Sequence, residues 1–294
     1  MEQFLTFLIP GIFVGMVYAL IAMGFVTIYR TTGVLNLAQG EIFLIAGYFM
    51  LFLVGGIGLS FWLAIPVMLG MLALVGVITE RIALRPLVGQ PIMGIILMTL
   101  GIGAFLRGVM TLFWTDLVRP VPSVFPLEGV PVLGVMISQA YLWFGVIALV
   151  VFIGLWLFFN RTRMGLLMKA AADATLLAQS CGVSVNTVTR MSWIISCITV
   201  GLGGYMLTTI TGAQPLMGAL GLRSLAVVLA GGMESIGGVM LMGPVVGAAE
   251  FIFAGYFDPF VGGALKEVIA FVLLIFFLLI RPQGLFGWRI IERL

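Results

Sequence analysis

The sequence predicts an all-α fold: a polytopic transmembrane helical bundle of about eight membrane segments, some of them broken or re-entrant. The composition is the first observation, because 62% of the 294 residues are hydrophobic and only 9% are charged. Soluble domains carry about 25% charged residues. The second is that apolar runs of about 20 residues, enough to cross a hydrocarbon core of about 30 Å, recur along the chain. The alternating pattern of a membrane β-barrel is absent, so the spans are predicted to be helices.

The expected spans follow these apolar runs in order. The first, at 4–29, is expected to remain as a span, because no Lys or Arg precedes it and it exceeds the about 7–15 residues of a signal-peptide core. The segment DLVRPVPSVFPLEGVP, at 116–131, holds four prolines and predicts an ordered outer loop. The other spans are expected at 41–57, 60–79, 92–114, 138–159, 191–211, a broken stretch at 222–257, and 265–280.

The basic residues predict the orientation of the spans, because cytoplasmic loops carry the excess of Lys and Arg. Ten of the fourteen basic residues fall on one side of the predicted spans. These are Arg30, Arg81, Arg85, Arg161, Arg163, Lys169, Arg190, Arg281, Arg289 and Arg293. The N-terminus is therefore expected outside and the C-terminus inside. Termini on opposite sides require an odd number of crossings, whereas eight single crossings would be even. The stretch 222–257 is therefore expected either to enter and leave by the outer face or to cross twice.

Several function classes are excluded by residues that the chain lacks. It has no histidine, and so no HExxH zinc site and no Ser-His or Cys-His pair, and it has no GxSxG motif. We expect no catalytic residues and no metal site. There is no Walker A motif, so any ATP hydrolysis is expected on another chain. The basic residues lie in short loops, which indicates topology rather than nucleic-acid binding. Cys181 and Cys197 stand apart and indicate no disulfide.

Polar residues interrupt the second span and the broken stretch in a similar way. NLAQGEIFLIAG carries Asn36, Gln39 and Glu41, and LAGGMESIGGVMLMG carries Glu234. Paired interruptions of this kind point to a transport site built from broken helices, because unwound backbone is tolerated only where it lines a cavity or packs on protein. These four residues are our candidates for lining a transport path.

Two interpretations of these residues stay open on the sequence. In the structural one, Glu41 begins the second span, where the helix dipole favours a negative charge, and Glu234 is a turn residue. In the functional one, the amides of Asn36 and Gln39 share a face at i, i+3 spacing and bind a passing zwitterion, while Glu234 faces Glu41 across the path.

Three further charged positions lie in or beside the spans. Glu250 falls well inside an apolar run and needs a partner, for which Arg107 and Arg223 are the candidates. Arg107 is expected instead to extend toward the outer interface. Lys266, with the acid that follows it, is expected to anchor the last span at the interface.

The predicted cytoplasmic loop at 160–190 is about 30 residues long, whereas helix connections are commonly 2–8 residues. Its middle is rich in alanine and leucine and favours helix. Asp173 is expected to cap a short helix that starts at Ala174, and Gly182 to end it in the left-handed conformation. Such a helix can rest on lipid headgroups or sit in a groove of another protein; the residues alone leave both open.

This loop resembles the coupling loop of ABC importer permeases, in which a short helix inserts into a cleft of the ATPase. The general motif there is Glu-Ala-Ala-x-x-x-Gly; here Leu176, Leu177 and Ala178 take the first three places, and only the last alanine and Gly182 match. In lacking the glutamate and keeping the glycine, this loop resembles that of the branched-chain amino acid permeases. Five segments resemble that LivH-type subfamily in order: TTGVLNLAQGEIFLIAGY, ERIALRPL, RTRMGLLMKAAADATLLAQSCGV, LAGGMESIGGVMLMGPVVGAAE and LLIRPQGLFG.

The resemblance implies a single transmembrane permease domain over 1–294 in the bacterial cytoplasmic (inner) membrane, carrying branched-chain or related amino acids. The implied partners are a second, LivM-like permease subunit, two cytoplasmic ATPase subunits that hold the ATP, and an extracytoplasmic substrate-binding protein; no cofactor is expected on this chain. The implied ATPase-coupling residues are Asp173, Ala174, Leu177, Ala178 and Gly182. The alternative is a stand-alone secondary carrier or channel for a small polar solute, which would not require the long loop.

Overall fold

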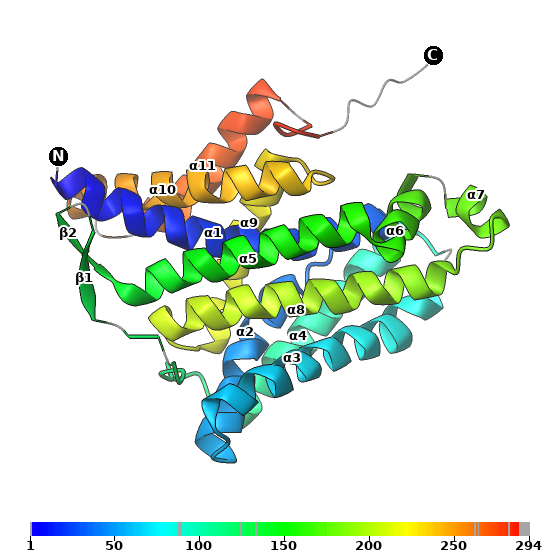
Figure 1. Ribbon diagram of the computed structural model, residues 1–294, viewed down its shortest axis with the longest axis horizontal. Helices are drawn as coiled ribbons and strands as arrows, with labels where there is room; N and C mark the ends of the chain where they lie inside the picture. The colour runs from blue at the N-terminus through cyan, green and yellow to red at the C-terminus, as the bar shows by residue number, and fades with distance from the viewer. Residues whose placement is uncertain are drawn as a thin grey trace.

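The computed structural model describes residues 2–87, 90–123, 125–126, 128–132, 134–173, 175–261, 263, 265–281 and 283–287. Within these residues, seven helical segments are long and apolar enough to cross a membrane, which confirms the all-α bundle (Figure 1). They are α1 (Glu2–Thr32), α2 (Gln39–Met50) with the π-helical η1 (Leu51–Gly56), α3 (Phe61–Ile78) with η2 (Thr79–Leu84) and η3 (Arg85–Leu87), α4 (Ile92–Trp114), α5 (Gln139–Arg161), α8 (Val185–Thr211) and α10 (Ile236–Val261).

The remaining elements connect or complete these segments. They are β1 (Gly129–Val132), β2 (Val135–Ser138), α6 (Arg163–Asp173), α7 (Thr175–Ser180), η4 (Pro215–Met217), α9 (Gly218–Gly231) and α11 (Leu265–Ile280). β1 and β2 form an antiparallel hairpin in which Gly129 faces Ser138. The loop before the hairpin is tied to the end of α8, because Arg119 and Ala213 exchange backbone hydrogen bonds of 2.9 and 2.8 Å. These pairings make the predicted outer loop an ordered one.

The broken stretch predicted at 222–257 is made of α9 and α10, and its break is the turn at 232–235. Gly232 takes φ +102°, a backbone conformation that suits glycine. The C-terminal tail packs against this break, since the backbone N–H of Leu285 donates to the carbonyl of Ala230 at 2.9 Å. On the orientation predicted from the basic residues the tail is cytoplasmic. α9, with 14 residues, is not among the helices long enough to cross a membrane, so whether this stretch re-enters or crosses twice stays a prediction.

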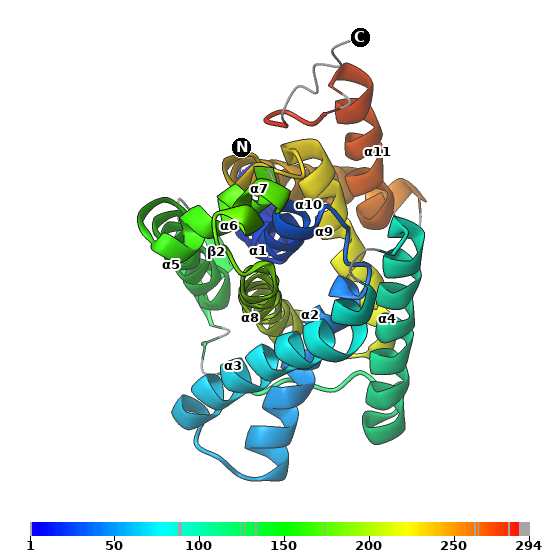
Figure 2. The same cartoon turned by 90° about the vertical axis from the view of Figure 1, so that its right-hand side faces the viewer.

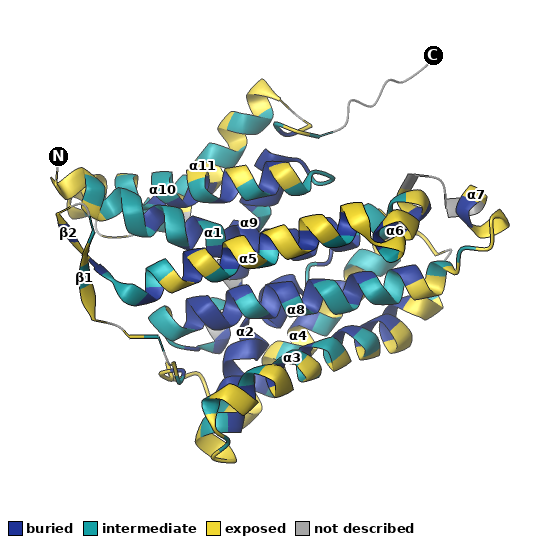
Figure 3. Ribbon diagram, viewed as in Figure 1, coloured by how far each residue is buried: buried dark blue, intermediate teal, exposed yellow. Residues whose placement is uncertain are grey.

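The core of the bundle lies around α1, which packs against α8 and α10 (Figure 2). Most residues of α1 from Val14 to Ile28 are buried. Figure 3 shows buried residues along α8 and α2, and exposed ones over the outer faces of α3 and α5. By contrast, most of the described residues of α4 are not buried within the chain. The apolar surface of α4 is thus left for lipid or for another protein.

Glycines bring α1 and α10 into backbone contact. Gly11 and Gly15 on α1 face Gly243 and Gly247 on α10, each pair spaced four residues apart. A Cβ added to Gly15 would overlap the carbonyl oxygen of Gly243, and one added to Gly247 would overlap that of Gly11. Small residues at this spacing let two membrane helices approach closely and gain van der Waals contact.

Replacement of Gly15 by leucine is expected to lower the free energy of unfolding by about 3 kcal/mol, the upper end of the usual cost of overpacking, because backbone cannot move aside as a side-chain tip can. The measurement is the melting temperature of the purified chain in detergent. Gly70→Leu on α3 is the matched control, since a Cβ there meets no atom of the described chain within 4 Å. Equal melting temperatures for the two variants would contradict the packing described.

Candidate transport site and coupling segment

The break between α1 and α2 begins with a glycine. α1 ends at Thr32, Gly33 takes φ +68°, and the chain remains irregular until α2 begins at Gln39. A residue with a side chain is strained at that φ, so Gly33 allows the chain to leave the helix and turn back. The unwound segment covers 33–38 and lies between the first two spans; Asn36 belongs to it as expected, whereas Gln39 and Glu41 are already part of α2.

Asn36 and Gln39 form a chain of hydrogen bonds that closes this break. Asn36 Nδ2 donates to Gln39 Oε1 at 2.6 Å, and Gln39 Nε2 donates to Ser196 Oγ at 2.8 Å. Ser196 Oγ then donates to the carbonyl of Gly24 on α1 at 3.0 Å. Both amide side chains are buried. Their polar atoms bind the protein itself, which favours the structural interpretation of this pair, and a direct role in the path stays a prediction.

Glu41 lies in the first turn of α2, as the sequence indicates, and binds a cation from α4. Arg107 donates to Glu41 Oε1 from Nε at 3.0 Å and also from Nη2. Arg107 thus pairs with a buried carboxylate while 50% of its side chain is exposed, and its extension toward the outer interface stays a prediction. The carboxylate also packs against Gly218 at the start of α9, where an added Cβ would overlap it. This point joins α2, α4 and α9.

The structure does not bring Glu234 to Glu41. Glu234 lies in the turn between α9 and α10, and Gly218, which contacts Glu41, is at the opposite end of α9. With 14 residues at 1.5 Å each, α9 separates the two ends by about 20 Å. A position for Glu234 directly across a path from Glu41 gains no support from this placement.

Glu250 is fully buried in α10, at 0% exposure, and binds Arg223 of α9. Arg223 Nη1 donates to Glu250 Oε1 at 2.6 Å, so the second of the two predicted partners is the one that the structure shows. Lys266, at the start of α11, places Nζ 3.7 Å from the centroid of the Phe251 ring, in a cation–π contact. Charged groups therefore link α9, α10 and α11 inside the bundle.

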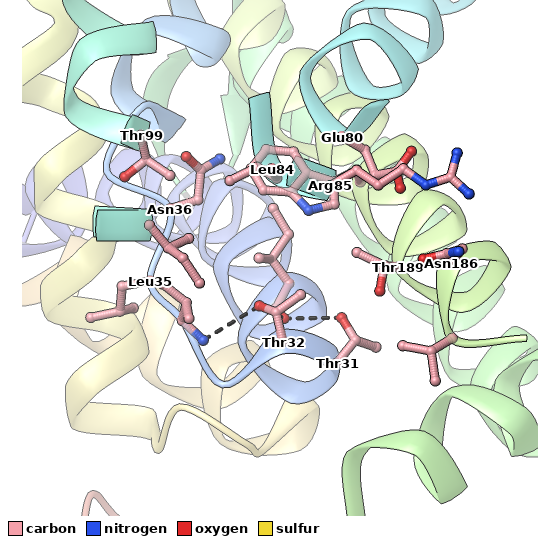
Figure 4. Close-up of a pocket in the computed structure, with 15 residues that line it drawn as sticks. Thr31, Thr32, Leu35, Asn36, Glu80, Leu84, Arg85, Thr99, Asn186 and Thr189 are labelled. Atoms are coloured by element: carbon pink, nitrogen blue, oxygen red, sulfur yellow. Dashed lines mark hydrogen bonds between the residues drawn. The ribbon is translucent and has the colours of Figure 1, made fainter. Parts of the chain in front are cut away.

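A cavity of about 220 Å³ opens beside the break between α1 and α2 (Figure 4). Asn36 is the one predicted path residue among its lining residues, and Glu80 of η2, at 1% exposure, adds a carboxylate. Glu80 was not among the predicted residues, because its segment was interpreted from the basic residues Arg81 and Arg85 and from its likeness to the permease family. The available signal was an acid placed directly at the end of an apolar run.

The predicted coupling segment forms α7, which lies at the end of the bundle where α8 begins (Figure 1). Leu177 is 68% exposed and Ala178 is buried. Gly182 takes φ +83°, its N–H donates to the carbonyl of Gln179 at 2.9 Å, and the N–H of Val183 donates to that of Ala178 at 3.0 Å. These two bonds make a Schellman motif, so the predicted left-handed end is confirmed.

The start of the coupling segment differs from the prediction. Asp173 is the last residue of an additional helix, α6, that the sequence analysis did not predict, and Ala174 lies outside the described residues, so the expected cap stays a prediction. The alanine-rich sequence continues the helical conformation through a position where a capping residue was expected. Cys181, directly before Gly182, is exposed, whereas Cys197 within α8 is buried.

The sequence was compared with known protein families. Residues 7–278 match the family described as "Branched-chain amino acid transport system / permease component". The chain belongs to this permease family. The resemblance inferred from the five sequence segments is thus confirmed, and the permease is a multi-pass protein of the cytoplasmic membrane. Family membership also favours a component of a transport system over an enzyme or a stand-alone carrier.

Relatives match this permease over almost its whole length. The high-affinity branched-chain amino acid transport system permease protein BraD of Pseudomonas aeruginosa is 30% identical, over 99% of this permease and 98% of BraD. The corresponding protein LivH of Escherichia coli K12 is 27% identical over 99% of both chains. A probable branched-chain amino acid transport permease protein LivH of Methanocaldococcus jannaschii is 30% identical over 94% of this permease and 90% of its own length.

A solved structure shares the fold. PsaBC from Streptococcus pneumoniae, solved in complex with Fab, superposes on the permease with a TM-score of 0.53 and covers 96% of this chain and 93% of its own. The sequence identity is 14%, so the likeness concerns the arrangement of helices alone.

Proposed function

We propose that this permease is the transmembrane subunit of an ATP-driven importer that carries branched-chain or related amino acids inward across the cytoplasmic membrane. The family description and the names of the relatives support the substrate class. The observation that carries the coupling to ATP is α7, a short helix with an exposed leucine, held in one shape by the hydrogen bonds around Gly182. A rigid apolar projection of this kind fits a cleft in another protein.

The proposed partners are a second permease, two cytoplasmic ATPases that bind the ATP, and an extracytoplasmic binding protein. The lightly buried α4 supports the second permease, since its apolar face is left uncovered within this chain. The outer loop that Arg119 and Ala213 tie to the end of α8 offers an ordered surface for the binding protein. This chain itself is proposed to bind no cofactor and to catalyse no reaction.

In the proposed mechanism, closure of the ATPases moves α7, and alternating access follows from the motion of the broken helices. α6 and α8 flank α7 along the chain, and α8 is bonded to the break through Ser196 and Gln39. Movement of α8 is therefore transmitted directly to the start of α2. The close contact of Gly40 with Gly218 carries it on to α9.

The test is purification of the tagged permease in mild detergent, with its partners identified by mass spectrometry and by crosslinking. In a Cys181→Ser background, Leu177→Cys is expected to crosslink to an ATPase. Glu128→Cys is the matched control, because it lies on the outer loop. Recovery of the permease alone or as a homo-oligomer, with no ATPase crosslink from position 177, would reject the importer in favour of the stand-alone carrier.

A further inference from the structure

The 220 Å³ cavity lies where the ends of five elements meet an unwound segment. Its walls come from the end of α1 and the unwound segment after it, from η2 and η3, from the start of α4 and from the start of α8. Arg85 and Arg190, two of the basic residues that predict the cytoplasmic side, come from the same elements. On that orientation the cavity faces the cytoplasm. Unwound backbone that lines a cavity is the usual setting of a transporter binding site.

One part of the wall accepts hydrogen bonds. Glu80 contributes a buried carboxylate, which Arg190 reaches only with a contact of 3.5 Å between Nε and Oε2. The hydroxyls of Thr31 and Thr32 donate to the carbonyl of Ile28, at 3.0 and 2.9 Å. Their protons are thereby used, and the Thr32 oxygen already accepts from the backbone N–H of Val34 at 3.3 Å, so each oxygen keeps at least one lone pair for a ligand. A group with several N–H donors, such as an ammonium, suits these acceptors.

A hydrogen-bond donor in the wall lacks a partner. Trp193 lines the cavity and is buried, and its indole Nε1–H has no hydrogen-bond partner among the described residues. A buried donor without a partner is costly, so a turn of the indole that brings the enclosed Nε1–H to a ligand oxygen in the cavity gains free energy. An indole N–H can only donate, which makes a carboxylate oxygen a suitable acceptor for it.

Val34, Leu35, Leu84 and Ile95 form an aliphatic part of the wall, and Arg85 with the polar side chains of Asn36, Thr99, Asn186 and Thr189 lines other parts of it. Figure 4 shows Glu80, Asn186 and Thr189 toward one side of the cavity, and Leu35, Asn36 and Thr99 toward the other. The volume is below the about 300–1,000 Å³ of pockets for drug-sized ligands, so the occupant must be small.

We propose that this cavity is a cytoplasm-facing binding site for a small aliphatic α-amino acid. Its ammonium binds Glu80, its carboxylate accepts from Trp193 Nε1, and its side chain packs on the aliphatic wall. The ligand class rests on the proposed function, while the site and the roles of these residues go beyond it. In transport, the site would bind the amino acid just before its release into the cytoplasm. Because the cavity opens to that side, the amino acid can also enter it from the cytoplasm, which makes binding measurable.

The test measures binding of radiolabelled L-leucine to the purified complex in lipid nanodiscs, without the extracytoplasmic binding protein. Saturable binding is expected. Glu80→Gln is expected to weaken it at least tenfold, and Trp193→Phe several-fold. N-acetyl-L-leucine, which lacks the ammonium, should fail to compete. Glu128→Gln is the matched control and should bind as wild type, since this carboxylate is exposed on the outer loop. Size-exclusion profiles and melting temperatures verify that each variant is folded.

Arg190→Gln separates ligand binding from a structural role of Glu80. It removes the contact to Glu80 but keeps the carboxylate, so leucine binding should persist in it. Equal loss of binding in Arg190→Gln and Glu80→Gln would overturn the assignment of Glu80 to the ligand. Leucine uptake by the complete transporter without saturable binding would overturn this inference alone. Absence of both uptake and binding would overturn the proposed function together with it.

Discussion

Replacement of Gly182 by valine is expected to reduce amino-acid uptake to less than about a tenth of the wild-type rate, while the amount of inserted protein stays unchanged. Gly182 takes φ +83° and ends α7 through the bonds at Gln179 and Ala178. A β-branched residue is strained at that φ, so the last turn of α7 must rearrange and the position of Leu177 changes with it. The spans do not depend on this turn, which leaves insertion intact.

The measurement is uptake of radiolabelled leucine by cells, normalised to the permease found in their membranes. Gly237→Val near the start of α10 is the matched control, because it has no positive φ and a Cβ there meets no atom of the described chain within 4 Å. It should transport normally. Normal uptake by the Gly182 variant at normal abundance would show that the shape of α7 does not matter for coupling.

Replacement of Arg223 by methionine is expected to lower the free energy of unfolding by about 3–5 kcal/mol. The change leaves the carboxylate of Glu250, at 0% exposure, without the guanidinium that donates to it at 2.6 Å. A buried charge that loses its partner carries its desolvation cost with less to offset it. Lys266 also lies within electrostatic range of Glu250, so part of the field on the carboxylate remains.

The melting temperature in detergent reports this loss, and Arg161→Met, at an exposed arginine at the end of α5, serves as the control. The double variant Arg223→Met with Glu250→Met should recover most of the stability, because neither charge is then left buried alone. If the double variant is as unstable as the Arg223 single variant, the cost comes from lost packing rather than from the unpaired carboxylate.

The sequence was most informative where one physical effect dominates. The length and apolarity of the spans follow from the thickness of the membrane, and α4 and α11 begin or end within a residue of the expected positions. Gly33 and Gly182 mark breaks, because their left-handed conformation is strained for other residues. Within the predicted loop at 160–190, the left-handed end of the short helix was predictable for the same reason.

Features that depend on tertiary contacts were not predictable in the same way. Arg107 and Glu41 are 66 residues apart, and only the packing of α4 on α2 brings them together. Glu80 lines the same cavity as the unwound segment and Trp193, and these three come from separate parts of the chain. Their proximity follows from the folded structure and not from the local sequence. The position of Asp173 at the end of α6 was not predictable, because a local preference cannot show whether the preceding residues are already helical.

Cys181 is exposed and Cys197 is buried, so the wild-type chain carries one thiol that a reagent in solution can reach. The exposed thiol stands directly after α7, while the other is enclosed in α8, so a maleimide reagent distinguishes them without any engineering. In the proposed importer, the rate of alkylation at position 181 would measure the fraction of time for which the proposed ATPase leaves this segment uncovered. Each stage of the transport cycle would then be visible as a kinetic signal at one atom, Sγ of Cys181.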